Sequence, residues 1–229
     1  MPPVHSGGVF IMFKFQLFPF VDLIRFRSRE SLERGIGRLL SADGEAIPIH
    51  YALIRPGVKK YISRGFDQSV LDELHTRVLA YEPYSPFTES EKTNCLMAIE
   101  LMRSMAVPPV SIFSFEHGET IVLPIGGIDL RIAVDAVLTW FDENGIKHVG
   151  AIKTKIKKGA FLRESGEMAA CLMASALKVR YPEAIVDPHH CYCYDLFRQR
   201  LIPALRMQAN LDLAKRMAEL IASKGDLAA

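Results

Sequence analysis

The sequence predicts an α+β protein with an N-terminal module at residues 1–87 and a second module at residues 88–229. β-rich segments separated by turn signals fill residues 110–156, and an Ala- and Met-rich helical segment follows. A proline-rich stretch at residues 81–87 is the best candidate linker. The 229 residues are 49% hydrophobic with a net charge of +2. This composition predicts a globular core without disulfide or metal, and no global basic field that would attract nucleic acid.

The N-terminal module is expected to hold two strands and two helices. Its strands are predicted at residues 13–20 and 47–54, and its helices at residues 27–40 and 67–79. Asp67 is a good N-cap for the second helix, because its carboxylate can accept hydrogen bonds from the first turn. Pro56 and Gly57 predict a turn after the second strand.

Two features bear on cellular location. The apolar stretch at residues 8–20 is interrupted by Lys14, Gln16 and Pro19, and it is shorter than the roughly 20 residues of a spanning helix. We therefore expect a buried strand there and no membrane contact. The four cysteines show neither a CxxC pair nor the density of a secreted disulfide scaffold, which predicts reduced thiols in the cytoplasm; they are Cys95, Cys171, Cys191 and Cys193.

The second module reads as helix, antiparallel strands, helix, strand and helical tail. A helix capped by Thr88 or Ser90 is predicted to run to about residue 105, and its apolar face belongs in the core or in a homodimer contact; the face consists of Leu96, Met97, Met102 and Met105. The later elements are strands at 110–115, 120–125, 128–141 and 147–156, a helix at 164–180, a strand at 183–194, and a helical tail at 196–223 broken near Pro203.

Asp135 stands out because it lies inside the apolar strand predicted at 128–141. On such a strand Ile132 and Val134 would share one face with Ala136, and Leu138 and Trp140 would follow on that face. A turn of odd length, or a bulge, would bring Asp135 onto the same face as Lys153 of the next strand. An unpaired buried carboxylate is costly, so we expect Asp135 to meet Lys153 or Arg131, or to bind a metal.

This order of elements, with an Asp and a Lys on successive strands, resembles the PD-(D/E)XK nuclease superfamily and in particular its RecB-like branch. The resemblance covers about residues 90–194 and implies a restriction-endonuclease-like core with an N-terminal α/β extension. In that family an Asp on the second core strand and a Glu-x-Lys on the third bind Mg²⁺ and activate water. Here the stretch from Gly150 keeps Lys153, but Ala151 stands at the position of the acid.

The resemblance implies a DNA nuclease that depends on Mg²⁺ or Mn²⁺. Asp135 would bind the metal, Lys153 would act on the nucleophilic water, and a second carboxylate would come from Glu167 or Glu164, with Glu100 and Glu119 as further candidates. The DNA backbone would contact Lys155, Lys157, Lys158 and Arg163. The alternative is a catalytically inactive nuclease-like domain that binds nucleic acid or a protein partner.

Other patterns have competing interpretations. The lysines at 153–158 are also typical of a solvated strand surface. Lys59 and Lys60, with Tyr61 and Arg64, form a basic patch compatible with DNA binding or with a solvated loop. The His and Cys residues of 187–195 have poor spacing for a zinc site, so we expect buried thiols of a core strand there. A small-molecule enzyme unrelated to nucleases would instead show an apolar cavity away from the lysine strand.

Overall fold

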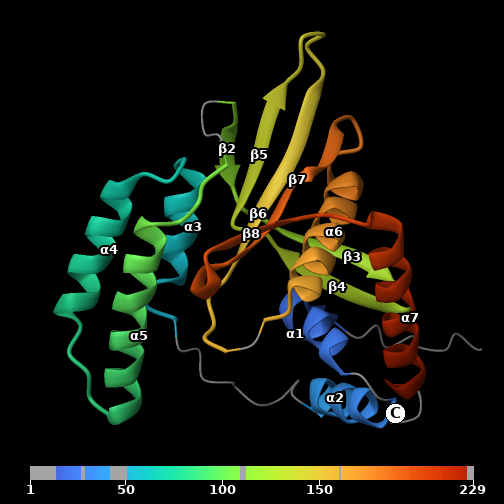
Figure 1. Cartoon of the computed structure of the whole chain (residues 1–229), viewed down its shortest axis with the longest axis horizontal. Coiled ribbons are helices and arrows are strands. Elements are labelled where there is room, and N and C mark those ends of the chain that lie inside the picture. Colours follow the sequence, from blue (N-terminus) through green and yellow to red (C-terminus); the bar gives the residue numbers. More distant parts are fainter. Residues whose placement is uncertain (1–13, 27–28, 42–50, 109–111, 160, 226–229) are drawn as a thin grey trace, which may run out of the picture.

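The computed structural model describes residues 14–26, 29–41, 51–108, 112–159 and 161–225, and the fold is α+β (Figure 1). The first half is mainly helical, with β1 (Lys14–Gln16), α1 (Leu17–Val21), η1 (Asp22–Arg25), α2 (Arg29–Ser41), α3 (Arg55–Ser63), α4 (Gln68–Ala80) and α5 (Pro86–Arg103). The second half holds β2 (Ser114–His117), β3 (Thr120–Ile125), β4 (Ile128–Ala133), β5 (Ala136–Phe141), β6 (Lys147–Lys155), α6 (Arg163–Arg180), β7 (Ile185–Asp195), η2 (Leu196–Arg198), β8 (Arg200–Pro203) and α7 (Met207–Gly225).

The described strands form two sheets. The larger has the order β2-β5-β6-β7-β8, in which β6 and β7 are parallel and joined through α6, and the other neighbours are antiparallel. The smaller has the order β1-β4-β3. Strand β6 therefore lies at the centre of the larger sheet, flanked by β5 and β7, and not at an edge.

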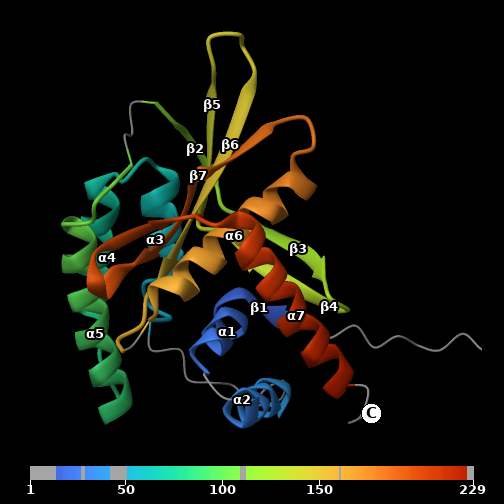
Figure 2. The same cartoon turned by 45° about the vertical axis from the view of Figure 1, so that its right-hand side comes forward.

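The larger sheet has helices on both faces. Helices α3, α4 and α5 cover one face, whereas α6 packs on the other face and also contacts β3 of the smaller sheet (Figures 1 and 2). Alternate residues of the sheet enter two hydrophobic cores. The α3–α5 core includes Ala136, Leu138, Ile152 and Tyr194. The α6 core includes Val137, Ala151, Cys191 and Cys193.

Most of the predicted helices are confirmed. The Asp67 carboxylate accepts a hydrogen bond from the backbone N–H of Ser69 and caps α4 as expected. Helix α5 begins earlier than predicted, because Ser85 and Thr88 form a capping box with Pro86 in the first turn. The proline-rich stretch is thus partly helical, and Thr88 is the third helical residue and not the N-cap. Helix α6 spans the predicted range and buries most of its length.

The strand predicted at 128–141 is wrong in one respect, because it is divided at Val134 and Asp135. Residues up to Ala133 belong to the smaller sheet and residues from Ala136 belong to the larger one. Consequently Val134 lies in the α6 core while Ala136 lies in the α3–α5 core, and they do not share a face. A Cβ atom on Gly118 would lie 2.2 Å from the carbonyl oxygen of Val134, so only glycine allows this crossing.

Four further predictions are corrected. The strand at 13–20 gives way to α1 at Leu17, and its first residue lies outside the described part. Pro56 and Gly57 lie in the first turn of α3, where proline is tolerated. Residues 51–54, the described part of the strand predicted at 47–54, form a turn. The tail at 196–223 contains the strand β8 before its helix, since β8 pairs with β7.

The relation of the two predicted modules stays a prediction. Residues on both sides of position 87 contribute to the α3–α5 core, among them Leu71 of α4 and Ile99 of α5. None of the helices in the described ranges combines the length and the apolar character needed to cross a bilayer.

Candidate functional site

A cavity of about 540 Å³ opens at the carboxyl end of β6. Residues from α1 and η1, from α3 and its preceding turn, and from β6 and the following loop form its walls. It is lined by Phe18, Pro19, Asp22, Tyr51, Arg55, Val58, Lys59, Asp135, Lys153, Thr154, Lys155, Ile156 and Lys157. Five lining side chains are therefore cationic and two are carboxylates.

Asp135 and Lys153 meet in this cavity, which is one of the alternatives that the sequence predicts for Asp135. The turn at residues 142–146 between β5 and β6 has an odd length, and Ala136 lies opposite Ile152. The Lys153 Nζ donates to Asp135 Oδ1 at 2.8 Å, and the backbone N–H of Thr154 donates to Asp135 Oδ2 at 2.6 Å. Asp135 is only 4% exposed, so these two donors compensate a carboxylate that burial would otherwise destabilise.

Lys155 is buried in the same cavity. Its Nζ lies 3.2 Å from Asp22 Oδ2, and 4.4 Å and 4.9 Å from the ring centres of Phe18 and Phe161. Burial lowers the pKa of Lys155, and the nearby Asp22 carboxylate opposes that shift. Lys155 therefore lies inside the cavity and is not part of a solvated strand surface. Lys157 and Lys158, in contrast, are exposed.

Three other cations line the cavity, and they differ from Lys153 and Lys155 in their ion pairing. Among the described residues, no carboxylate lies within salt-bridge distance of Arg55, Lys59 or Lys157. Arg55 and Lys59 are four residues apart on α3 and so project from the same side of that helix. The N-cap of α3 is Ile54, which supplies no side-chain hydrogen bond, and the first turn holds no acidic residue.

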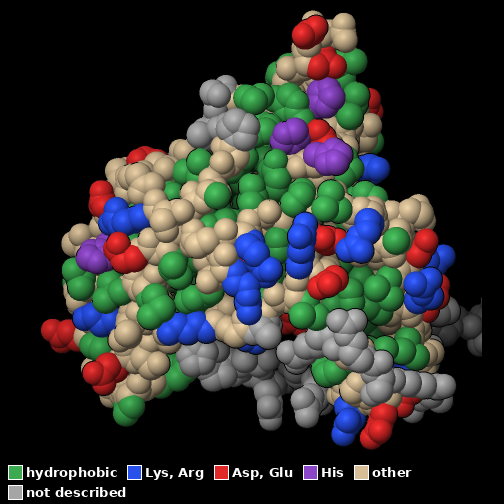
Figure 3. All heavy atoms as spheres, in the orientation of Figure 1, with side chains coloured by type: hydrophobic (Ala, Val, Ile, Leu, Met, Phe, Trp, Pro, Cys, Tyr) green, Lys and Arg blue, Asp and Glu red, His purple; other side chains and the backbone are tan. Residues whose placement is uncertain are grey.

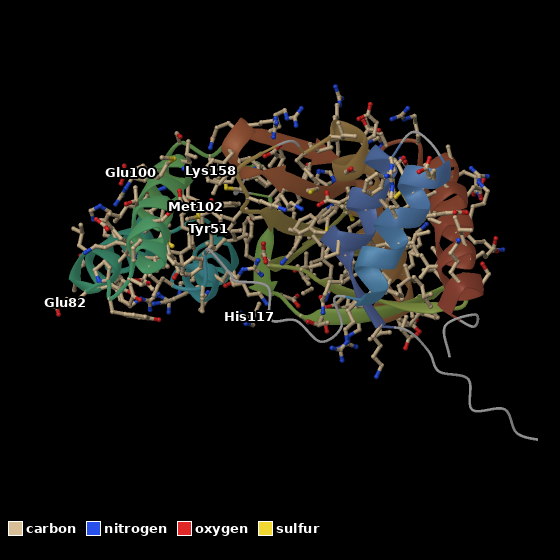
Figure 4. The ribbon with its side chains drawn as sticks, turned by 90° about the horizontal axis from the view of Figure 1, so that it is seen from below. Tyr51, Glu82, Glu100, Met102, His117 and Lys158 are labelled. Carbon is tan, nitrogen blue, oxygen red and sulfur yellow. The ribbon has the colours of Figure 1, made fainter. Side chains whose placement is uncertain are left out.

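The loop after β6 is tied to its surroundings by the backbone. Burial raises the pKa of the Tyr51 hydroxyl, and a hydrogen bond with the backbone of Lys158 opposes that shift. Figure 4 places Tyr51 and Lys158 near each other beside α3. Arg198 donates to the carbonyl of Gly159 and Arg200 to that of Phe161. Lys158 itself does not line the cavity.

The predicted second carboxylates lie elsewhere. Glu167 is buried and is bound by Arg163 at 3.2 Å and by Arg206, and Glu164 is exposed. Neither residue lines the cavity. Figure 3 shows Lys and Arg side chains with acidic neighbours across the middle of the face on which α6 and β8 lie. Arg163 is thus an exposed partner of Glu167 outside the cavity.

The other two candidate acids are also engaged in structural contacts. Glu119 accepts hydrogen bonds from Arg180 at 3.0 Å and from the Tyr181 hydroxyl at 2.7 Å. Burial acts to raise the pKa of Glu119, but these two donors outweigh it and hold the pKa below its usual value. Glu100 is exposed and pairs with Arg103 at 3.3 Å.

The His and Cys residues of β7 belong to the packing of the sheet. Cys191 and Cys193 are buried, as predicted, and burial raises the pKa of each thiol to about 12. His190 pairs with Asp187 at 2.8 Å and packs against Trp140. Across the described part of the chain, no group of three His, Cys, Asp or Glu side chains is placed to hold a metal ion.

Asp22 is the acid that sequence reasoning missed. It lines the cavity with Asp135, and these two are the acidic residues of the lining. The available signal was its position, since Asp22 is a single acid within an apolar stretch, as Asp135 is. Asp22 pairs with Lys155 and Asp135 pairs with Lys153, so both carboxylates of the lining already have a cationic partner.

The comparisons with known proteins assign no family. No protein-family model matches the chain, and a search of curated proteins finds no relative.

Proposed function

We propose that this chain is a nuclease-like, nucleic-acid-processing protein whose basic cavity binds the phosphate backbone of DNA. The observation that carries the proposal is the set of three cavity cations without a carboxylate partner among the described residues, Arg55, Lys59 and Lys157. The order α5, strands, α6, β7 and the Asp135–Lys153 pair at the same cavity support the resemblance to the PD-(D/E)XK superfamily.

The positions of Arg55 and Lys59 on α3 lower the stability of this helix, which favours a role for these two charges in binding an anion. Like charges four residues apart destabilise a helix by a few tenths of a kcal/mol, and a cation in the first turn opposes the helix dipole. Arg55 and Lys59 together incur the first cost, and Arg55 in the first turn incurs the second. Neither has an acidic neighbour within ion-pair distance among the described residues. An anion bound in the cavity would attract both cations and the helix dipole, and these attractions would offset both costs.

The first test uses two variants of the same helix. We expect Arg55→Gln combined with Lys59→Gln to weaken binding of a fluorescent DNA oligonucleotide at least tenfold, measured by anisotropy. The slope of log affinity against log salt should fall by about 1.4–1.8, because two phosphate contacts are lost. Lys60→Gln is the matched control for Lys59→Gln alone, since each removes one charge from the same helix, and Lys60 pairs with Glu73 at 2.8 Å and lies outside the cavity. Equal losses in both proteins would place the binding surface elsewhere.

The loop after β6 gives a second comparison. Lys157 lines the cavity and its neighbour Lys158 does not. Lys157→Glu should therefore weaken DNA binding more strongly than Lys158→Glu, although both change the net charge equally. Titrations at two salt concentrations measure the difference, and identical losses would indicate a diffuse electrostatic effect.

A second candidate function is hydrolysis of DNA with Mg²⁺ or Mn²⁺. The observation in its favour is that two carboxylates, Asp22 and Asp135, line one cavity with Lys153. A divalent ion there would supply Lewis-acid stabilisation of charge on the phosphate. In this protein Asp22 and Asp135 would hold the ion, and Lys153 would orient the attacking water or stabilise the developing negative charge.

The cleavage assay distinguishes the two candidates. Single- and double-stranded DNA is incubated with each metal and with wild type, Asp22→Asn, Asp135→Asn or Glu167→Gln. If the protein is a nuclease, we expect loss of cleavage in the two cavity variants and retention in Glu167→Gln. Loss of cleavage only in Glu167→Gln would indicate that Glu167, the acid predicted from the sequence, binds the metal. If wild type binds DNA without cleaving it, only the phosphate-binding function is supported.

The proposed setting is the cytoplasm. All four cysteines are buried thiols, and they take part in the cores instead of in disulfide bonds. This usage is typical of proteins in a reducing compartment.

A further inference from the structure

We infer that the cavity takes a single unpaired nucleotide of a DNA strand and does not take the backbone of an intact duplex. This inference rests on the proposed function, because it names which form of DNA the basic cavity recognises. Three features support it: the size of the cavity, the presence of both apolar and cationic side chains in its walls, and a buried hydroxyl without a partner among the described residues.

The size of the cavity suits a small molecule. Cavities of about 300–1,000 Å³ enclose ligands of drug size, and the volume here is about 540 Å³. A base in an intact duplex is stacked and paired, so it enters a protein pocket only after flipping out, at a cost of a few kcal/mol. An unpaired base in a single strand enters without that cost.

The walls carry both kinds of group that a nucleotide requires. Phe18, Tyr51, Val58 and Ile156 supply apolar and aromatic surface. The cations already described supply charge, with Arg55 and Lys59 on one side of α3. A nucleotide has one planar apolar part and one anionic part, and proteins that bind single strands combine aromatic side chains with a positive groove. A cavity for phosphate alone would not need the aromatic surface.

Thr154 adds a polar group to the cavity lining. Its hydroxyl oxygen is buried and has no hydrogen-bond partner among the described residues. Such a group costs free energy in the folded protein unless a ligand or a water satisfies it. The backbone N–H of Thr154 donates to Asp135 Oδ2 at 2.6 Å, which ties this residue to the ion pair of Asp135 and Lys153.

The test compares two DNA molecules with equal numbers of phosphates. One is a single-stranded oligonucleotide of mixed sequence. The other is a duplex closed at both ends by hairpin loops, and the loops are made of abasic linkers so that they offer no unpaired base. The phosphates of the loops are included when the two molecules are matched. We expect the single strand to bind at least tenfold more tightly at physiological salt. Equal or tighter binding of the closed duplex would overturn the inference while leaving DNA binding in place. If neither DNA binds, the proposed function itself is wrong.

Two variants test the roles of the walls. Phe18→Leu keeps the apolar volume and removes the aromatic face, and we expect it to lower single-strand affinity at least fivefold with less than a twofold change for the duplex. Phe141→Leu is the matched control, because Phe141 is exposed on β5 and lies outside the cavity. Thr154→Val should weaken single-strand binding without lowering the melting temperature. Equal losses for both DNA molecules in Phe18→Leu, or unchanged binding in both cavity variants, would contradict the inference.

Discussion

At the scale of single residues, the pair of Asp135 and Lys153 is the most consequential contact of the cavity. Lys153 supplies one of the two donors of a carboxylate that is almost fully buried. Removing one partner of a buried ion pair leaves the other charge without compensation, at a cost of about 3–5 kcal/mol. The side chain of Lys153 is itself 15% exposed, which places the expected cost at the lower end of that range.

We therefore expect Lys153→Met to lower the free energy of unfolding by about 3 kcal/mol. The double variant Asp135→Asn with Lys153→Met should recover part of this loss, because the uncompensated charge is gone. Urea denaturation of wild type, the two single variants and the double variant provides the cycle. Additive effects of the two substitutions would show that the pair is not coupled.

Lys155 makes stability depend on pH in the alkaline range. Its pKa in the folded protein is lowered from 10.5, mainly by burial. Between the lowered pKa and 10.5 the unfolded chain binds more protons than the folded protein, so the contribution of Lys155 to the free energy of unfolding rises with pH.

We expect wild type to gain stability relative to Lys155→Met as the pH is raised from neutrality toward 10.5. The difference between the two proteins isolates Lys155 from tyrosines that also titrate in this range. Urea denaturation at intervals of one pH unit measures it. A difference that stays constant with pH would indicate that Lys155 has its ordinary pKa in the folded protein.

At the scale of elements, the crossing of the chain from β4 to β5 positions Asp135. The crossing depends on Gly118, where a Cβ atom would lie 2.4 Å from the carbonyl carbon and oxygen of Asp135. Gly118→Ala must displace this backbone and should cost about 2–3 kcal/mol, in the range of other overpacked sites. DNA binding should also weaken, since Asp135 holds Lys153 at the cavity.

Gly37→Ala provides the control for this substitution. Gly37 lies on α2, and a Cβ atom added there would have no neighbouring atom within 4 Å. Alanine is the better helix former, so this variant should gain about 0.5–1 kcal/mol. Thermal denaturation of both variants measures the contrast, and a similar effect of the two alanines would contradict the close approach at Gly118.

At the scale of the whole molecule, the larger sheet joins the two cores. Neighbouring residues of one strand enter different cores. On β5, for example, Val137 lies in the α6 core and Leu138 lies in the α3–α5 core. Unfolding of the larger sheet therefore exposes the apolar side chains of both cores at once. We expect a single cooperative unfolding transition.

The fluorescence of Trp140, the only tryptophan, reports on β5 and therefore on the shared sheet. Its transition in urea should coincide with the loss of helical circular dichroism. Separate transitions would instead support independent unfolding of the modules predicted at 1–87 and 88–229.

The sequence by itself determined the elements whose signals are local. The N-cap and periodicity of α4 and the Ala- and Met-rich composition of α6 predict these helices. Strand alternation with an odd turn length makes Lys153 one of the partners predicted for Asp135. Each of these relations depends on residues close in the chain or on a single hairpin. The buried thiols of β7 follow from the same alternation.

Only the tertiary structure decided which residues join Asp135 at the cavity. Asp22 and Lys155 are 133 positions apart, and no periodicity relates them. Glu167 has the spacing of a buried helical residue, but the direction of α6 places it against Arg163 and Arg206 instead of in the cavity. The division between β4 and β5 likewise arises from pairing with two different sheets. Long-range packing, which sequence patterns do not encode locally, thus selected the members of the site.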